Sequence, residues 1–194
     1  MNRCNELEEC IEEYRKVRIE KKSDYLANNL TSMETLFYEK LELLVKEQTS
    51  LQESETEREV KYFYLCRLMS SEYTESYESV LGLSTQMLYL DQQKSQVYWF
   101  PHLIYKNIQM DMKEVEQIVR KKFLRLEASE LFYLKRKLLG DDWNLLQKCF
   151  SDLIKGAMEV FMNRSLKLEK ELVVLSGNYM DHLQIVWHGD TERR

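Results

Sequence analysis

Two carboxylate pairs are the residues in this chain whose types and spacing come closest to a catalytic arrangement. Neighbouring acids such as Glu12-Glu13 and Asp141-Asp142 can supply acid–base catalysis or bind a metal. The first pair falls in an acidic helical stretch, which favours a solvated helix face. The second pair stands where a helix is expected to begin, which favours a helix cap. We therefore predict structural roles for both pairs.

The three histidines form no catalytic or metal-binding pattern. His102 follows Pro101, the only proline, at an expected helix start, where a local hydrogen bond accounts for an imidazole. His182 and His188 are six residues apart, and on a strand that spacing separates two side chains by roughly 20 Å. We predict no metal site and no catalytic histidine.

Motifs for cofactors and nucleophiles are also missing from the sequence. It contains no G-x-x-x-x-G-K-[ST], no G-x-G-x-x-G, no G-x-S-x-G and no H-E-x-x-H. The four cysteines are scattered, without the close pairs of a zinc site, and Cys66 and Cys149 fall in apolar patterns typical of small buried residues. We expect a non-enzymatic protein without a cofactor; an active site assembled from distant residues is the alternative.

The composition is typical of a soluble globular protein. Of 194 residues, 44% are hydrophobic and 31% charged, and the chain has only five glycines, which favours helices. No apolar run approaches the roughly 20 residues that span a bilayer. The N-terminus, MNRCNELEECIEE, is acidic and does not resemble a signal peptide. We expect a cytoplasmic protein that does not bind membranes.

Charge is distributed unevenly along the chain. Residues 1–60 contain 15 Asp and Glu against 9 Lys and Arg, whereas residues 61–194 contain 18 against 19. Within the second part, residues 113–137 hold eight basic side chains and four acidic ones. An acidic N-terminal part favours a basic partner, and the basic segment could follow phosphates.

Hydrophobic periodicity predicts the helices at the N-terminal end. Over residues 5–22 an apolar stripe at spacings of three and four stands opposite four acids. A break is expected near Asn28-Asn29, followed by a second helix with a seven-residue repeat. That repeat predicts a seam for another helix, either the first one folded back or a second copy of the chain. The seam consists of Leu30, Phe37, Leu44 and Leu51.

Four further helices are expected in the rest of the chain. The third ends near Ser71, with Val60, Phe63, Tyr64 and Leu68 inward. The fourth starts at Pro101 and covers roughly 25 residues, by the apolar spacing of three and four. Gly140 is expected to end a fifth helix, and Asp141 or Asp142 to cap a sixth.

Two stretches depart from helical periodicity. Residues 76–100 include Tyr98-Trp99-Phe100, and residues 171–188 read as strand, turn, strand. We predict a mainly α fold, a bundle of about six helices with a small antiparallel β element from residues 76–100 and 171–188; all-α is the alternative. One domain is expected over 1–194, with a helical hairpin over 1–52 and a helical core with a β-rich centre over 53–194.

These features favour a regulatory protein that binds another protein, as an inhibitor, immunity factor, antitoxin or adaptor does. Its surface would combine an acidic helix face with exposed aromatic rings. The residues predicted to contact the partner are Glu8, Glu9, Glu12, Glu13, Tyr98 and Trp99.

A nucleic-acid-binding protein is the alternative function. Its contacts would come from the basic helix around residues 113–137, whose side chains can neutralise phosphates. The central residues of that surface are Arg120, Lys121, Lys122 and Arg125, flanked by Lys113, Lys135, Arg136 and Lys137.

Overall fold

The computed structural model describes residues 3–54, 58–91, 95–163 and 166–190. The chain forms two compact units: a helical unit (residues 1–30 and 102–148) and a sheet unit (residues 31–101 and 149–194). The elements in chain order are α1 (Arg3–Glu53), β1 (Val60–Arg67), α2 (Met69–Thr74), β2 (Ser79–Ser84), the 3₁₀ turn η1 (Leu88–Leu90), β3 (Ser95–Trp99), α3 (His102–Tyr105), α4 (Ile108–Arg120), α5 (Ala128–Asn163), β4 (Leu168–Asn178) and β5 (Leu183–Asp190).

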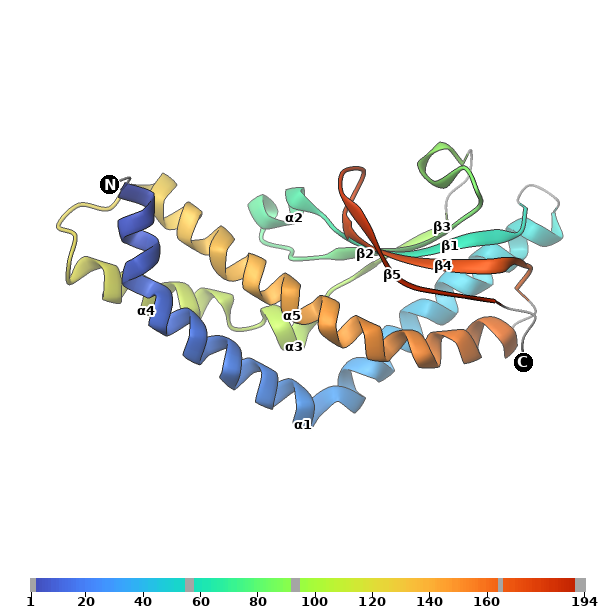
Figure 1. Cartoon of the computed structure of the whole chain (residues 1–194), viewed down its shortest axis with the longest axis horizontal. Coiled ribbons are helices and arrows are strands. Elements are labelled where there is room, and N and C mark those ends of the chain that lie inside the picture. Colours follow the sequence, from blue (N-terminus) through green and yellow to red (C-terminus); the bar gives the residue numbers. More distant parts are fainter. Residues whose placement is uncertain (1–2, 55–57, 92–94, 164–165, 191–194) are drawn as a thin grey trace. The chain divides into compact units, whose positions relative to one another are not determined.

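The sheet unit is built on one five-stranded mixed sheet in the order β3-β2-β1-β4-β5 (Figure 1). Strand β1 lies in the centre, antiparallel to β2 and parallel to β4, and β3 and β5 complete the two antiparallel edges. The prediction of a bundle of about six helices with a small antiparallel β element is therefore wrong, and so is the all-α alternative. The two β-rich stretches do not pair with each other, because β1 separates them.

The central strand β1 is the element that the sequence pattern misassigned to a helix. Its sequence, VKYFYLCR, is rich in aromatic and β-branched residues, and four consecutive residues from Phe63 to Cys66 are buried. A strand covered on both faces has such an unbroken apolar run. Val60, Phe63 and Tyr64 also fit a helical spacing of three and four, so this short run did not distinguish the two structures.

One face of the sheet is covered by the part of α1 after residue 30 and the part of α5 after residue 148 (Figure 1). Phe63 of β1 packs against Phe150 and Phe161 of α5, with ring centroids 5.7 and 5.2 Å apart. Phe37 of α1 packs edge-on against Trp99 of β3 at 5.3 Å. These contacts form the aromatic core of the sheet unit.

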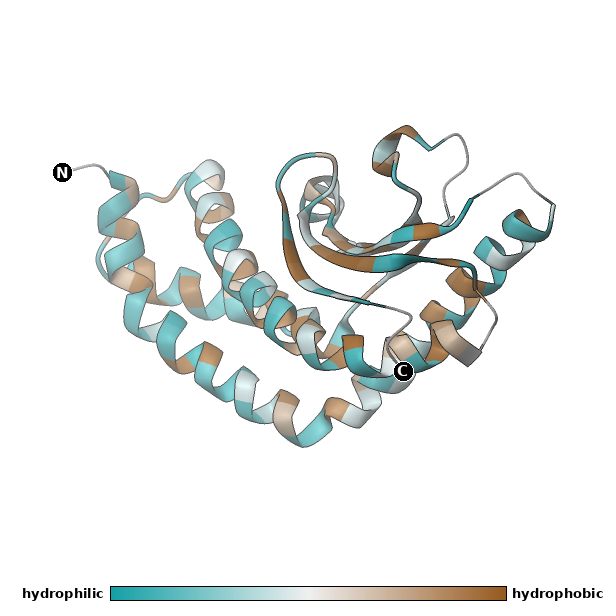
Figure 2. Cartoon of the chain, turned by 45° about the vertical axis from the view of Figure 1, so that its right-hand side comes forward, coloured by the Kyte–Doolittle hydropathy of each residue, from teal (hydrophilic) through white to brown (hydrophobic). Residues whose placement is uncertain are grey.

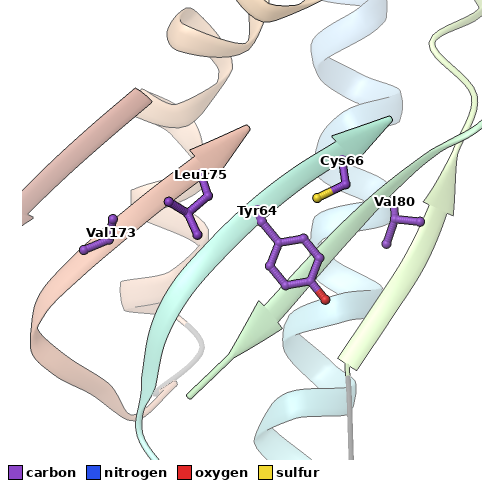
Figure 3. Packing of buried hydrophobic residues seen from close by; sticks show 5 residues of the cluster. All are labelled: Tyr64, Cys66, Val80, Val173 and Leu175. Atoms are coloured by element: carbon purple, nitrogen blue, oxygen red, sulfur yellow. The ribbon is translucent and has the colours of Figure 1, made fainter. Parts of the chain in front are cut away.

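The opposite face of the sheet carries a second apolar cluster (Figure 3). A Cβ atom at Gly82 of β2 would overlap the Tyr64 ring, so the glycine gives that ring its place across β2. The cluster consists of Tyr64, Cys66, Val80, Val173 and Leu175.

In the helical unit, α4 and the N-terminal parts of α1 and α5 each bury an apolar stripe. Helix α1 has one residue with non-helical backbone angles, Asn29 (φ −127°, ψ 16°), at the expected break. The expected fourth helix is divided into α3 and α4, and α5 continues through Gly140 instead of ending there. The buried apolar residues include Leu7, Ile11, Val115, Val119, Leu134 and Leu138.

Part of the predicted helix seam packs inside the sheet unit, to which Phe37, Leu44 and Leu51 belong. Phe37 and Leu44 are both fully buried, whereas Leu30 and Leu51 are half-buried. Phe37 also packs edge-on against Phe150, at 6.1 Å between ring centroids. Two of the four seam residues therefore already have their apolar partners within the chain.

Candidate functional site

The acidic surface predicted on the first helix lies on the N-terminal part of α1. Leu7 and Ile11 anchor this part of the helix in the core of the helical unit, and Glu9, Glu12 and Glu13 are exposed. Figure 2 shows that this part of α1 is mainly hydrophilic. The apolar stripe of the helix faces the core and the acids face away from it, so three of the four predicted glutamates are accessible.

Glu8, the fourth predicted glutamate, is held within the helical unit. Its carboxylate accepts a hydrogen bond from the Tyr133 hydroxyl at 2.8 Å and forms ion pairs with Lys137 at 3.0 Å and Arg15 at 3.1 Å. The hydrogen bond from Lys137, with smaller help from Tyr133, lowers the pKa of Glu8. Glu8 thus connects α1 to α5 and is less available to a partner.

Three basic residues of α1 form ion pairs with carboxylates of the same unit, of which Asp142 is buried and Asp141 is partly exposed. Arg15 makes a bidentate ion pair with Asp141, with both nitrogens 2.8 Å from the carboxylate oxygens. Arg18 binds Asp142 at 2.6 Å, and Lys22 binds Asp142 at 3.0 Å. Both aspartates thus lie within α5 as ion-pair partners, so their predicted role as caps of a sixth helix is wrong.

Arg18 is the most deeply buried cation of this cluster, with its side chain 4% exposed. Its Nε atom donates to Asp111 of α4 at 2.8 Å. Burial acts to lower the pKa of Arg18, but the carboxylates of Asp142 and Asp111 outweigh it and raise the pKa. The guanidinium is therefore charged and joins α1, α4 and α5.

This ion-pair cluster was missed at the sequence level, although a signal for it exists. Arg15, Arg18 and Lys22 follow one another at spacings of three and four, so they share one side of a helix. Such a basic stripe beside an apolar stripe lies near the core, where carboxylates of other helices can reach it. Their identity could not be predicted, since the partners are about 90 to 125 residues away along the chain.

The consequence is a sorting of charge on α1. The fold uses Arg15, Arg18 and Lys22 internally and leaves the acids outside. Between residues 9 and 24, five carboxylates are exposed against two lysines. The exposed acids are Glu9, Glu12, Glu13, Glu20 and Asp24, and the exposed lysines are Lys16 and Lys21. We call the five acids the acidic face.

The two aromatic residues predicted to contact a partner lie on opposite sides of β3. Tyr98 is 58% exposed, whereas Trp99 is 2% exposed and packs against Phe37. Successive residues of a strand point to opposite faces, which accounts for the difference. Only Tyr98 of this pair is accessible as a surface contact.

A group of polar side chains on the sheet, which the sequence did not reveal, surrounds Tyr64. Gln96 donates to the Tyr64 hydroxyl at 2.5 Å and to the Tyr179 hydroxyl at 3.1 Å, and Cys66 lies 3.7 Å from the Tyr89 hydroxyl. Burial raises the pKa of Tyr64 and of Tyr89, and raises that of Cys66 to about 11. These groups are therefore protonated near neutral pH, which suits packing and hydrogen bonding rather than nucleophilic attack.

The basic residues predicted for nucleic acid lie at the end of α4 and in the segment after it. Arg120 is paired with Glu116, one turn earlier, at 2.6 Å. Lys121, Lys122 and Arg125 are exposed. Of the flanking residues, Lys113 is exposed, Lys135 is buried, and Lys137 is bound to Glu8.

The described histidines, cysteines and carboxylates do not assemble into a recognisable metal site. Across residues 3–54, 58–91, 95–163 and 166–190, no group of three or more such residues is placed to hold a metal ion. Nδ1 of His188 lies 3.9 Å from the carboxylate of Glu171. In the same part of the chain, no helix has the length and apolarity that crossing a bilayer requires.

Comparisons with protein-family models, curated proteins and solved structures found no match to this chain.

Proposed function

We propose that this chain is a non-enzymatic regulatory protein that binds another protein through the acidic face of α1. The partner would present a basic surface, and the protein would act by occupying that surface, as an inhibitor, immunity factor, antitoxin or adaptor does. Tyr98 remains a second candidate contact in the sheet unit.

The sorting of charge on α1 is the observation that carries this proposal. Solvated acids on a helix are common, but here three basic residues of the same turns, Arg15, Arg18 and Lys22, are neutralised by Asp111, Asp141 and Asp142. The acidic face is therefore left with an excess of negative charge. Such a surface attracts a basic partner and accelerates encounter, most strongly at low ionic strength.

Charge reversal on the acidic face tests the proposal. Tagged wild-type chain and the double variant Glu9→Lys/Glu13→Lys would be used to capture proteins from a lysate of the source cells. The matched control is Glu39→Lys/Glu47→Lys, which reverses two exposed acids in the sheet-unit part of the same helix. A protein captured by wild type and control but lost with the first variant is the expected result.

The association kinetics of that captured protein provide the second measurement. The association rate constant of the wild-type chain should fall as salt is added, because the distance over which charges attract in solution shortens to about 8 Å at physiological ionic strength. The Glu9→Lys/Glu13→Lys variant should associate about tenfold more slowly at low salt and lose most of this dependence. Equal capture and equal rates for all three chains would contradict the acidic face as the docking surface.

A further inference from the structure

A cavity of about 420 Å³ lies in the helical unit, between α1, α3 and the start of α4. This volume is within the range of about 300–1,000 Å³ that small-molecule sites occupy. Its lining residues are all within residues 1–30 and 102–148. They are Tyr14, Val17, Arg18, Lys21, Lys22, Tyr25, Leu103, Lys106, Asn107, Asp111 and Glu114.

Arg18, Lys21, Lys22 and Lys106 line this cavity as basic groups, against the acidic Asp111 and Glu114 and the buried Asp142, which pairs with Arg18 and Lys22; one positive charge is left in excess. Arg18 and Lys22 are neutralised by Asp111 and by the buried Asp142. Within the described part of the chain, neither Lys21 nor Lys106 has an ion-pair partner. Lys106 instead donates to the Tyr25 hydroxyl at 2.8 Å and lies 4.3 Å from the centre of the same ring.

Arg18 has a buried hydrogen-bond donor that lacks an acceptor in the described part of the chain, which is an observation independent of the charge of the lysines. Its Nη1 atom is buried and has no hydrogen-bond partner among the described residues. A buried N–H without an acceptor is unfavourable, and the effect is larger on a charged group. Because Arg18 lines the cavity, an anionic oxygen entering with a small rearrangement of the guanidinium would satisfy this donor.

We propose that this cavity binds a small organic phosphate, a phosphate monoester on an aromatic or apolar body. Lys21 and Lys106 provide the charge for the phosphate, and Arg18 Nη1 provides a charge-assisted hydrogen bond. The rings of Tyr14 and Tyr25 together with Leu103 form the apolar wall for the body of the ligand. The proposal does not depend on the acidic face.

Phenyl phosphate is a suitable probe because it combines the two parts of the predicted ligand. Binding to the whole chain would be followed by nuclear magnetic resonance titration at low salt. Phenol, which has the ring without the charge, and inorganic phosphate, which has the charge without the ring, are the comparison probes. Saturable binding of phenyl phosphate, with shifted signals at Tyr25 and Lys106 and weaker binding of both comparison probes, is expected.

The double variant Lys21→Gln/Lys106→Gln removes the unpaired charges without touching the buried cluster. It should bind phenyl phosphate about tenfold more weakly or worse, a loss typical of charge-assisted contacts. The control Lys155→Gln changes a lysine of the sheet unit whose side chain is 82% exposed, and should bind as the wild type does. Amide spectra of both variants report whether the fold is retained.

Two results would overturn the proposal. One is the absence of saturable phenyl phosphate binding up to about 10 mM, a range that covers the weak affinities of such fragments. The other is equal binding by wild type and by a folded Lys21→Gln/Lys106→Gln variant. Binding of inorganic phosphate as tight as that of phenyl phosphate would overturn the role of the aromatic wall.

Discussion

At the scale of single residues, Asp142 is the point where the ion pairs of the helical unit converge. Its carboxylate is fully buried and accepts from Arg18 and Lys22, whose side chains are 4% and 11% exposed. The attraction within a buried cluster is offset by the cost of desolvating the charges, so the cluster adds little net stability. Removing one member is a different matter, since the remaining charges stay buried without their counterion.

Asp142→Asn is therefore expected to destabilise the protein strongly. The substitution keeps the shape of the side chain and removes its charge, and breaking such a pair costs about 3 kcal/mol or more in free energy of unfolding. Urea denaturation measures this loss. The control is Glu116→Gln, which breaks the exposed pair with Arg120 on α4 and should cost less than about 0.5 kcal/mol. Similar losses for both variants would contradict the buried ion pairs of Asp142 with Arg18 and Lys22.

Glu8 predicts a pH dependence of stability with a definite sign. Its pKa is lowered in the folded protein, chiefly by the hydrogen bond from Lys137, relative to an ordinary value of 4.5. The folded state therefore binds this proton less tightly than the unfolded state does. The stabilisation is complete above pH 4.5 or so and is lost as the pH falls through the lowered folded-state pKa.

The measurement is the melting temperature of wild type and Glu8→Gln between about pH 6 and pH 3. The wild type should lose stability more steeply in the acid range, and the two curves should converge at the lowest pH. Parallel curves over the whole range would show that Glu8 is not coupled to Lys137 and Tyr133.

At the scale of elements, α5 runs from Ala128 to Asn163 through a glycine in its interior. Apart from its chain neighbours and the backbone of its own helix, no described atom lies within 4 Å of the position that a Cβ of Gly140 would take, and its backbone does not have a positive φ. Nothing in the structure therefore requires a glycine here. Gly140→Ala should raise the free energy of unfolding by about 0.5–1 kcal/mol, since glycine is a weaker helix former. Unchanged or lower stability in a denaturation curve would indicate that α5 is interrupted near this residue.

Strands β4 and β5 and the middle of helix α5 show which parts of the fold the sequence could predict and which it could not. The stretch over 171–188 reads as strand, turn, strand because turn residues separate two apolar runs, and β4 and β5 lie there. Gly140 followed by two aspartates has the local pattern of a helix end and a new cap. The distant partners Arg15, Arg18 and Lys22 give these aspartates another role, and no local pattern reveals such partners. The central strand β1 was missed for a different reason, since Val60, Phe63 and Tyr64 also fit the spacing of a helix.

Strand β3 gives a test of which faces its side chains occupy. Trp99 is buried against Phe37, so Trp99→Ala removes a large core side chain and should cost about 3–5 kcal/mol. Tyr98, its exposed neighbour, should tolerate the same truncation with a loss below about 1 kcal/mol. Thermal or chemical denaturation of the two variants measures the difference. A larger loss for Tyr98→Ala would mean that the register of β3 is shifted by one residue.

At the scale of the whole molecule, the balance of charge distinguishes protein binding from nucleic-acid binding. The chain has a net charge of −5, and the ion pairs of α1 leave acids exposed. The basic segment after α4 offers Lys121, Lys122 and Arg125, whereas Arg120 is partly neutralised by Glu116. Lys113 and Arg136 of the predicted surface are exposed as well. Since binding to nucleic acid depends on phosphate contacts, five accessible cations on an acidic protein predict weak binding that falls steeply with salt.

A fluorescently labelled single-stranded and a double-stranded oligonucleotide test this expectation by anisotropy. We expect no binding at about 150 mM salt, because the affinity that a few phosphate contacts provide falls as the salt concentration rises. Any binding at low salt should disappear in Lys121→Gln/Lys122→Gln/Arg125→Gln and persist in the control Lys155→Gln. Binding at physiological salt that depends on these three side chains would instead make nucleic acid the partner. An acidic protein can bind nucleic acid at that salt concentration only through a surface specialised for phosphate contacts.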